Sequence, residues 1–256
     1  MPVLAKLNFP PIGELVDWKK FGPLGFNKTA LIDILAVIIT LTVFFLAARK
    51  KALVPTGIQN VAESIIDFIT DSVILQTIGP DGMKFLPFLL TLFCFILVGN
   101  IFELIPLIQF PANARMANPL FLALLVWVIF LYQGFKNQGF RGYLRSALIP
   151  PGVPKALLLL VTPIEFLSTF IVRPFSLAVR LFANMLAGHL LLVTFALLTD
   201  ALIFHNTIKV FVPVAILPAV ANIAITGFEL LVAVLQAFIF TILAAVYIGG
   251  AMHPEH

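Results

Sequence analysis

Arg180 is the residue whose position in this sequence most needs a chemical explanation. It lies in an apolar run, residues 175–198, whose only other ionisable group is His189. An arginine at the centre of a membrane helix costs about 2.5–3.5 kcal/mol on insertion scales, so chains keep one where it faces a partner charge or a watery path. We therefore expect Arg180 to handle ions inside a bilayer.

Carboxylates and an imidazole accompany this arginine in apolar segments. Glu103, Glu165 and Glu229 each interrupt an apolar stretch, and His189 follows Arg180 by nine residues. One arginine cannot pair with three carboxylates, so in a closed ion-pair network some carboxylates would have no counter-charge. This favours groups that take up and release protons. Together these residues predict a proton path through the membrane.

Amide and hydroxyl side chains share helical faces with the ionisable groups. Because each residue of a helix advances by about 100°, Ser176 and Asn184 fall on the same side as Arg180, and His189 falls opposite it. The remaining polar candidates are Asn100, three residues before Glu103, and a stripe with a spacing of seven formed by Asn222, Glu229 and Gln236.

Each of these residues also has a structural alternative. Arg180 could form a salt bridge with Glu229 or Glu165, and His189 could form a buried pair with Glu229. Asn184 and Gln236 could be hydrogen-bonding contacts between helices. Glu103 could be solvated at an interface, and Glu165 could cap a water-filled crevice without transferring protons.

The composition defines the class of protein. The chain has 256 residues, of which 61% are hydrophobic and 11% charged, whereas soluble domains are about a quarter charged. Continuous apolar runs exclude a β-barrel and predict an all-α polytopic membrane protein. The basic residues, which give a net charge of +4, lie beside apolar segments, as membrane topology requires, and argue against nucleic acid as a partner. With Cys94 the single cysteine, we expect no disulfide, metal site or cofactor.

Apolar segments and basic residues together predict one membrane domain with its N-terminus outside and its C-terminus cytoplasmic, in a bacterial plasma membrane. We expect about five membrane-embedded helices and one amphipathic surface helix. The expected segments are an external arm (1–29), a first span (30–48), the surface helix (57–79), a span hairpin (85–107 and 119–135) and a long tilted hairpin (155–204 and 210–251). A basic loop, with Lys136, Arg141, Arg145 and Lys155, would follow the third span.

The stretch from residue 155 to about residue 204 is too long for an ordinary span. As one helix it would measure roughly 75 Å, whereas the hydrocarbon core is about 30 Å thick. Either two spans are joined by a turn or one helix is strongly tilted and kinked, with Pro163 and Pro174 as kink positions. We favour the tilted helix, because no polar turn of useful length occurs before Asp200.

Three motifs resemble those of subunit a of F-type ATP synthases. The first runs from Arg173 to His189, Arg-Pro-Phe-Ser-Leu-Ala-Val-Arg-Leu-Phe-Ala-Asn-Met-Leu-Ala-Gly-His. The second begins at Glu229 as Glu-Leu-Leu-Val-Ala-Val-Leu-Gln-Ala-Phe-Ile-Phe, and the third is Gly-Asn-Ile-Phe-Glu-Leu-Ile-Pro at residues 99–106. The resemblance covers nearly the whole chain in order.

The resemblance implies a proton-channel subunit of a rotary ATP synthase, with two offset half-channels and no catalytic site of its own. Arg180 would face the carboxylates of a ring of c subunits, with Asn184 and Gln236 as polar neighbours. His189 and Glu229 would line the half-channel open to the outside. The implied partners are the c ring, the b subunits of a peripheral stalk, the soluble catalytic head and the lipid bilayer.

Two further residues match the family less directly. Glu103 matches an acidic position on the outer path. Glu165 resembles an acid of the inner half-channel but is offset by one residue from the family pattern. The alternatives to a rotary subunit are a secondary transporter, which would be built from repeats that we do not find, and a purely structural scaffold, which would not need a mid-span arginine.

Overall fold

The structure is a computed structural model that describes residues 28–49, 54–105, 112–149, 154–203 and 212–252. Within these ranges every regular element is a helix and none is a strand. Five helices are long and apolar enough to cross a bilayer, which confirms the prediction of an all-α polytopic membrane protein. The expected external arm lies almost entirely outside the described residues, and so do residues 253–256 of the C-terminal tail.

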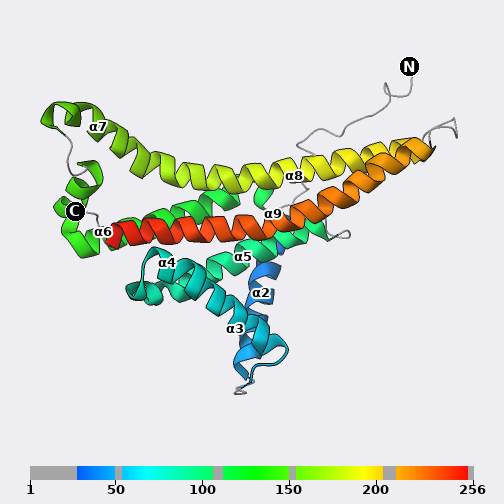
Figure 1. Ribbon diagram of the computed structural model, residues 1–256, viewed down its shortest axis with the longest axis horizontal. Coiled ribbons are helices and arrows are strands. Elements are labelled where there is room, and N and C mark those ends of the chain that lie inside the picture. The colour runs from blue at the N-terminus through cyan, green and yellow to red at the C-terminus, as the bar shows by residue number, and fades with distance from the viewer. Residues whose placement is uncertain (1–27, 50–53, 106–111, 150–153, 204–211, 253–256) are drawn as a thin grey trace, which may run out of the picture.

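The helices follow one another with short connections (Figure 1). In chain order they are α2 (Lys28–Arg49), α3 (Ile58–Ile69), a π turn η2 (Thr70–Ile74), α4 (Leu75–Thr77), a 3-10 turn η3 (Pro80–Phe85), α5 (Leu86–Leu104), a 3-10 turn η4 (Ala112–Ala114), α6 (Ala117–Leu148), α7 (Lys155–Leu167), a π turn η5 (Ser168–Val172), α8 (Arg173–Ile203) and α9 (Val212–Met252).

Helices α7 and α8 form one continuous, bent rod rather than two spans joined by a turn. The apolar stretch Leu157–Ile203 contains 47 residues and at 1.5 Å per residue is about 70 Å long. A rod of that length fits a hydrocarbon core of about 30 Å only when it is steeply inclined. The π turn η5 joins the two helices, and α9 runs alongside α8 as the second arm of the hairpin (Figure 1).

Helix α9 is the central element of the packing, lying between α8 and α5 and also contacting α6 (Figure 1). Its buried face carries small side chains, namely Ala233, Ala237, Ala244, Ala245 and Gly249. Small residues let helix backbones approach closely in a membrane, where dispersion contacts replace the hydrophobic effect as the driving force. The positions of side chains on α9 are therefore tightly coupled to those on α5 and α8.

The third span differs from the sequence-based expectation. The helical region α6 extends beyond residue 135 to Leu148, so the segment with Lys136, Arg141 and Arg145 is mostly helical rather than a loop. It is divided into two helices by a sharp bend at Gly139, whose backbone is non-helical (φ 72°, ψ 163°) and whose positive φ glycine adopts without strain. Gln138 fixes the bend by donating from Nε2 to the backbone oxygen of Ala251 at 3.0 Å.

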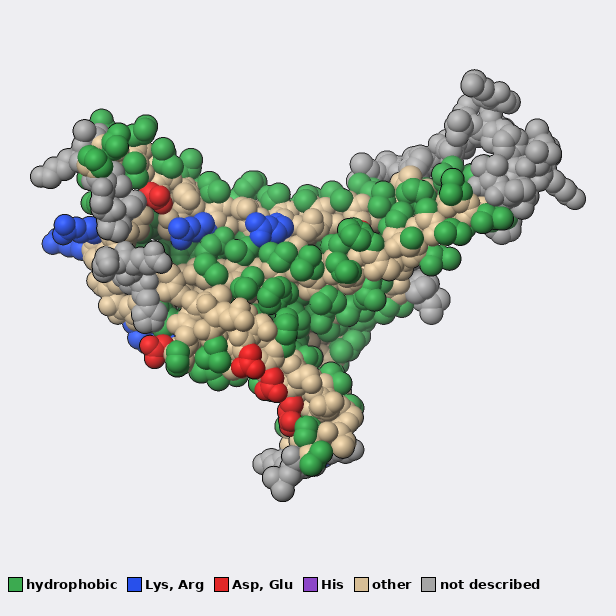
Figure 2. Space-filling view, in the orientation of Figure 1, with side chains coloured by type: hydrophobic (Ala, Val, Ile, Leu, Met, Phe, Trp, Pro, Cys, Tyr) green, Lys and Arg blue, Asp and Glu red, His purple; other side chains and the backbone are tan. Residues whose placement is uncertain are grey.

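Helix α3 and the π turn after it have one buried and one charged side. Ala62, Ile69 and Val73 are buried, whereas Asp67 and Asp71 are exposed and Glu63 is half-buried. Figure 2 shows acidic side chains in a row along α3. Helix α3 is not among the helices with the length and hydropathy of a span, so this amphipathic character fits a helix at the membrane surface.

Candidate functional site

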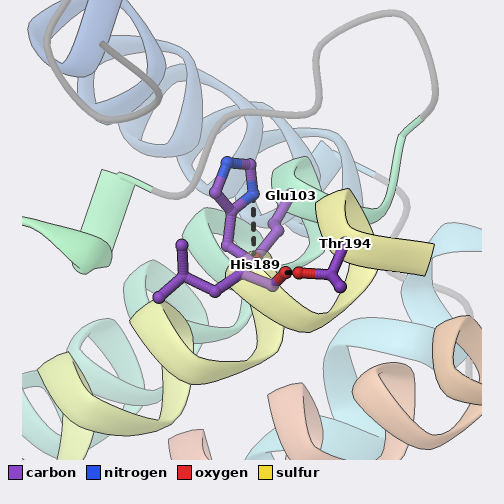
Figure 3. A network of polar contacts seen from close by, with 4 residues as sticks. Glu103, His189 and Thr194 are labelled. Carbon is purple, nitrogen blue, oxygen red and sulfur yellow. Dashed lines mark hydrogen bonds and ion pairs between the residues drawn. The ribbon is translucent and has the colours of Figure 1, made fainter. Parts of the chain in front are cut away.

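Glu103 and His189 meet in the interior of the helix bundle. Glu103 lies in the last turn of α5 and His189 in the middle of α8, and His189 Nδ1 is 3.5 Å from Glu103 Oε1 (Figure 3). The two residues are only 3% and 5% exposed. At this distance the pair is an ionic contact when His189 is protonated, and a proton passes between the two groups when they approach to about 2.6–3.2 Å or through one bridging water. Thr194, also drawn in Figure 3, instead donates to the backbone oxygen of Leu190 within α8.

A cavity of about 370 Å³ opens beside this pair. Glu103, His189, Asn222 and Thr226 supply its polar walls, and apolar side chains of α8 supply much of the rest. Among the described residues, Glu103 Oε1 and Asn222 Oδ1 are buried without a hydrogen-bond partner. Unpaired polar atoms around a space much larger than one water molecule indicate a hydrated cavity.

Glu229 places a third ionisable group next to this cavity. Its side chain is 6% exposed and lies directly on Gly188, because a Cβ atom added at Gly188 would overlap the carboxyl group of Glu229. Gly188 precedes His189, so the acid of α9 packs against α8 at the residue before the imidazole. In the described part of the chain, the ionic contact of His189 is with Glu103 and not with Glu229, so the buried His189–Glu229 pair considered above does not form.

Arg180 stands apart from these acids. It is exposed on α8, and no carboxylate in the described ranges forms an ion pair with it. Nine helical residues separate it from His189, about 13 Å along the axis. The salt bridges with Glu229 or Glu165 considered above are therefore not observed. Lys and Arg side chains mark the side of α8 that borders α9 in Figure 2.

An amide pair lies between Arg180 and Glu229. Asn184, one turn after Arg180, donates from Nδ2 to Gln236 Oε1 at 2.7 Å and so links α8 to α9. Gln236 is 2% exposed, and its Nε2 has no hydrogen-bond partner among the described residues. The stripe of Asn222, Glu229 and Gln236 therefore faces the inside of the bundle, as the spacing of seven predicts.

Glu165 and Ser176 lie on the other side of Arg180 along the chain. Both are half-buried, Glu165 on α7 and Ser176 on α8. The π turn η5 separates them and accommodates one extra residue, so the uniform 100° step that relates residues within α8 does not extend to Glu165.

Asn113 and Asp33 are polar residues of the interior that the spacing argument does not identify. Asn113 on η4 donates to Asn100 Oδ1 at 2.7 Å. Asp33 on α2 accepts from Asn118 Nδ2 at 2.8 and 3.0 Å. A carboxylate inside a first span is a detectable signal for Asp33, whereas Asn113 lies in a turn and offers no comparable signal.

The fold and this arrangement define a multi-pass helical membrane protein with ionisable groups inside its helix bundle. The chain belongs to the ATP synthase A chain family, whose sequence model matches residues 30–249. It is 46% identical to ATP synthase subunit a of Frankia alni, with 100% of this chain and 91% of the relative covered. It is 43% identical to the subunit a of a Nocardioides species, over 97% of this chain and 91% of the relative. Family membership confirms the resemblance drawn from the sequence motifs.

Proposed function

We propose that this chain is the proton-channel subunit of a rotary ATP synthase, with two offset half-channels that meet at Arg180. The observation that carries the proposal is that Glu103 and His189 line one cavity and that Glu229 packs on Gly188, the residue before His189. Arg180, without an ion-pair partner among the described residues, lies about 13 Å from His189 along the axis of α8. Family membership supplies the assembly in which such a path couples to ATP synthesis.

The outer half-channel is the cavity and the three ionisable groups around it. Protons enter the cavity, pass between Glu103 and His189, and reach Glu229 over Gly188. Carboxyl and imidazole groups suit this transfer because burial and mutual contact adjust their proton affinities toward working pH. The Asn184–Gln236 pair then continues the polar surface toward Arg180.

Arg180 separates the two half-channels and acts on the c ring, the proposed partner of the exposed side of α8 and α9. A fixed cation favours the ionised form of a ring carboxylate that comes opposite it. Because arginine stays protonated, it also prevents protons from passing directly between the half-channels. A proton must therefore travel with the rotating ring, and each charge that crosses 100 mV releases about 2.3 kcal/mol.

The inner half-channel runs past Ser176 and Glu165. Both are half-buried polar residues on the opposite side of Arg180 from the cavity. In this proposal the N-terminus lies outside, the C-terminus lies in the cytoplasm, and the chain has no catalytic site of its own. The b subunits of the peripheral stalk contact the acidic side of α3, and through them the chain is held to the catalytic head.

Replacing Glu103 with glutamine tests the outer half-channel. Glu103→Gln keeps the size of the side chain but removes its titration, so ATP-driven acidification of inverted vesicles is expected to fall roughly ten- to a hundredfold. The His189→Gln substitution is expected to lower ATP-driven acidification by a similar factor. Asp81→Asn, the same change of acid to amide at an exposed position of η3, is the matched control and should pump normally. Wild-type pumping by an assembled Glu103→Gln complex would refute the assignment of this cavity.

A further inference from the structure

Asn113 is the most buried polar side chain of the connection between α5 and α6 in the part of the chain that the structure describes. It lies on the 3-10 turn η4 and is 2% exposed. Its Nδ2 donates to Asn100 Oδ1 at 2.7 Å. A Cβ atom at Gly99 would lie 3.5 Å from this Nδ2, so the bare backbone of Gly99 forms one wall of the Asn113 site.

Asn100 extends this contact to α9. Its Nδ2 donates to the backbone oxygen of Ala233 at 3.4 Å, and Asn100 is 1% exposed. Ala233 is four residues after Glu229, and Asn100 is three residues before Glu103. The bridge therefore joins α5 to α9 about one helical turn from each of the two acids.

Asn113 also decides which atom of Asn100 faces α9. Because Asn113 donates through Nδ2, Asn100 must offer its Oδ1 to η4, which leaves its own Nδ2 for the oxygen of Ala233. If Asn100 turned over, its Oδ1 would face the Ala233 oxygen, so the hydrogen bond to α9 would be lost and the buried Oδ1 would have no donor on that side. Asn113 Oδ1 has no partner among the described residues, so its Nδ2 is the atom that contributes to the bridge.

We propose that Asn113 is a positioning residue which, through Asn100, fixes α9 against α5 and so keeps Glu229 in place over Gly188. This inference rests on the proposed function, because it places Asn113 in support of the same proton path. The small residues on α9 support this positioning role, because they pack α9 closely against its neighbours and closely packed helices move together. A shift of α9 at Ala233 would move the Glu229 carboxyl away from the Glu103–His189 contact.

The experiment measures ATP-driven acidification of inverted vesicles across a range of pH. Asn113→Asp keeps the shape of the side chain but replaces the donor with an acceptor. Asn100 is therefore expected to turn its Nδ2 toward η4 and to lose its hydrogen bond to the backbone oxygen of Ala233. Pumping should fall roughly three- to tenfold, as expected for one buried hydrogen bond, and the pH profile should shift. The acids and the histidine on the elements packed here are Asp33, Glu103, His189, Asp200 and Glu229, and the cations include Arg115, Arg173 and Arg180.

A double substitution separates positioning from general damage. Asn100→Ala and Asn113→Ala should be non-additive, with the double variant pumping no more slowly than Asn100→Ala alone, because both remove the same bridge. The matched control is Asn118→Ala, which removes an amide that bonds to Asp33 rather than one that reaches α9. It should retain the wild-type pH profile even if the complex becomes less stable.

Two outcomes would overturn the inference: a wild-type rate and pH profile for Asn113→Asp in the assembled complex, or a double variant whose loss equals the product of the two single losses.

Glu229→Gln, measured in parallel, identifies which proposal has failed. If Glu229→Gln stops pumping while the Asn113 variants pump normally, only the positioning role is wrong. If Glu229→Gln also pumps normally, the proposed function itself is wrong. If Asn113→Ala does not assemble, Asn113→Asp, which has the same shape, decides the question.

Discussion

Arg180→Ala is expected to abolish ATP-driven acidification of inverted vesicles while the complex still assembles. Arg180 is exposed on α8 and has no ion pair in the described ranges, so its removal leaves no buried counter-charge and should cost little folding free energy. What is lost is the fixed cation that favours an ionised ring carboxylate and blocks direct transfer between the half-channels. Passive proton leak through membranes stripped of the catalytic head should therefore rise as pumping disappears.

Two further variants make the Arg180 result specific. Arg180→Lys keeps a positive charge but not the guanidinium group, and it should also fail to pump, because a lysine in a low-dielectric site can give up its proton. Arg173→Gln removes another cation seven residues earlier on the same helix. Arg173 lies over the ring of Tyr247 on α9 at 5.6 Å, so its guanidinium is already engaged within the bundle and most pumping should remain without it. An Arg180→Ala complex that pumps at the wild-type rate would make Arg180 a structural cation.

Gly188→Ala is expected to have the second-largest effect, roughly tenfold or more on ATP-driven pumping. The added methyl group would occupy the space of the Glu229 carboxyl. The obstructing atoms are the end of a flexible side chain rather than backbone, so we expect Glu229 to move while α8 and α9 stay packed. The variant thus displaces a titratable group without removing it.

Gly250→Ala is the matched control for this prediction. Gly250 is likewise a glycine within a long helix, near the C-terminal end of α9, but a Cβ atom there meets nothing within 4 Å. Alanine favours a helix over glycine, so this variant should assemble and pump normally. If Gly188→Ala pumped as well as Gly250→Ala, the position of the Glu229 carboxyl over Gly188 would not matter for proton transfer.

The long helices could be predicted because their signal is continuous apolar sequence. The stretch that forms α7 and α8 exceeds one bilayer thickness and lacks a polar turn, and these two features together favour one tilted helix over two spans. The helical continuation of α6 could not be predicted in the same way. Residues 136–148 are basic and contain glycines, and their helix depends on a bend at Gly139 and on the long-range hydrogen bond between Gln138 and Ala251.

The candidate site shows the same division between local and long-range information. Arg180 and His189 lie in one regular helix, where the 100° step puts them on opposite sides, and the structure has Arg180 exposed and His189 buried. Across the π turn η5 a uniform 100° step does not relate α8 to Glu165 on α7, because the extra residue is not visible in a sequence spacing. Contacts between residues far apart in the chain could not be predicted from sequence patterns either. His189 contacts Glu103 rather than Glu229, and Asn113 is linked to α9 only through Asn100.

The central claim is that two aqueous half-channels on opposite sides of the membrane are separated by Arg180. It is tested most directly by the sidedness of thiol labelling in a Cys94→Ala background, which removes the single native cysteine. Thr226→Cys places a thiol in the wall of the outer cavity, and Ser176→Cys places one four residues before Arg180. A small membrane-impermeant thiol reagent should modify the first from outside and the second from the cytoplasmic side. If both thiols reacted from the same side, the account of two offset half-channels would be contradicted.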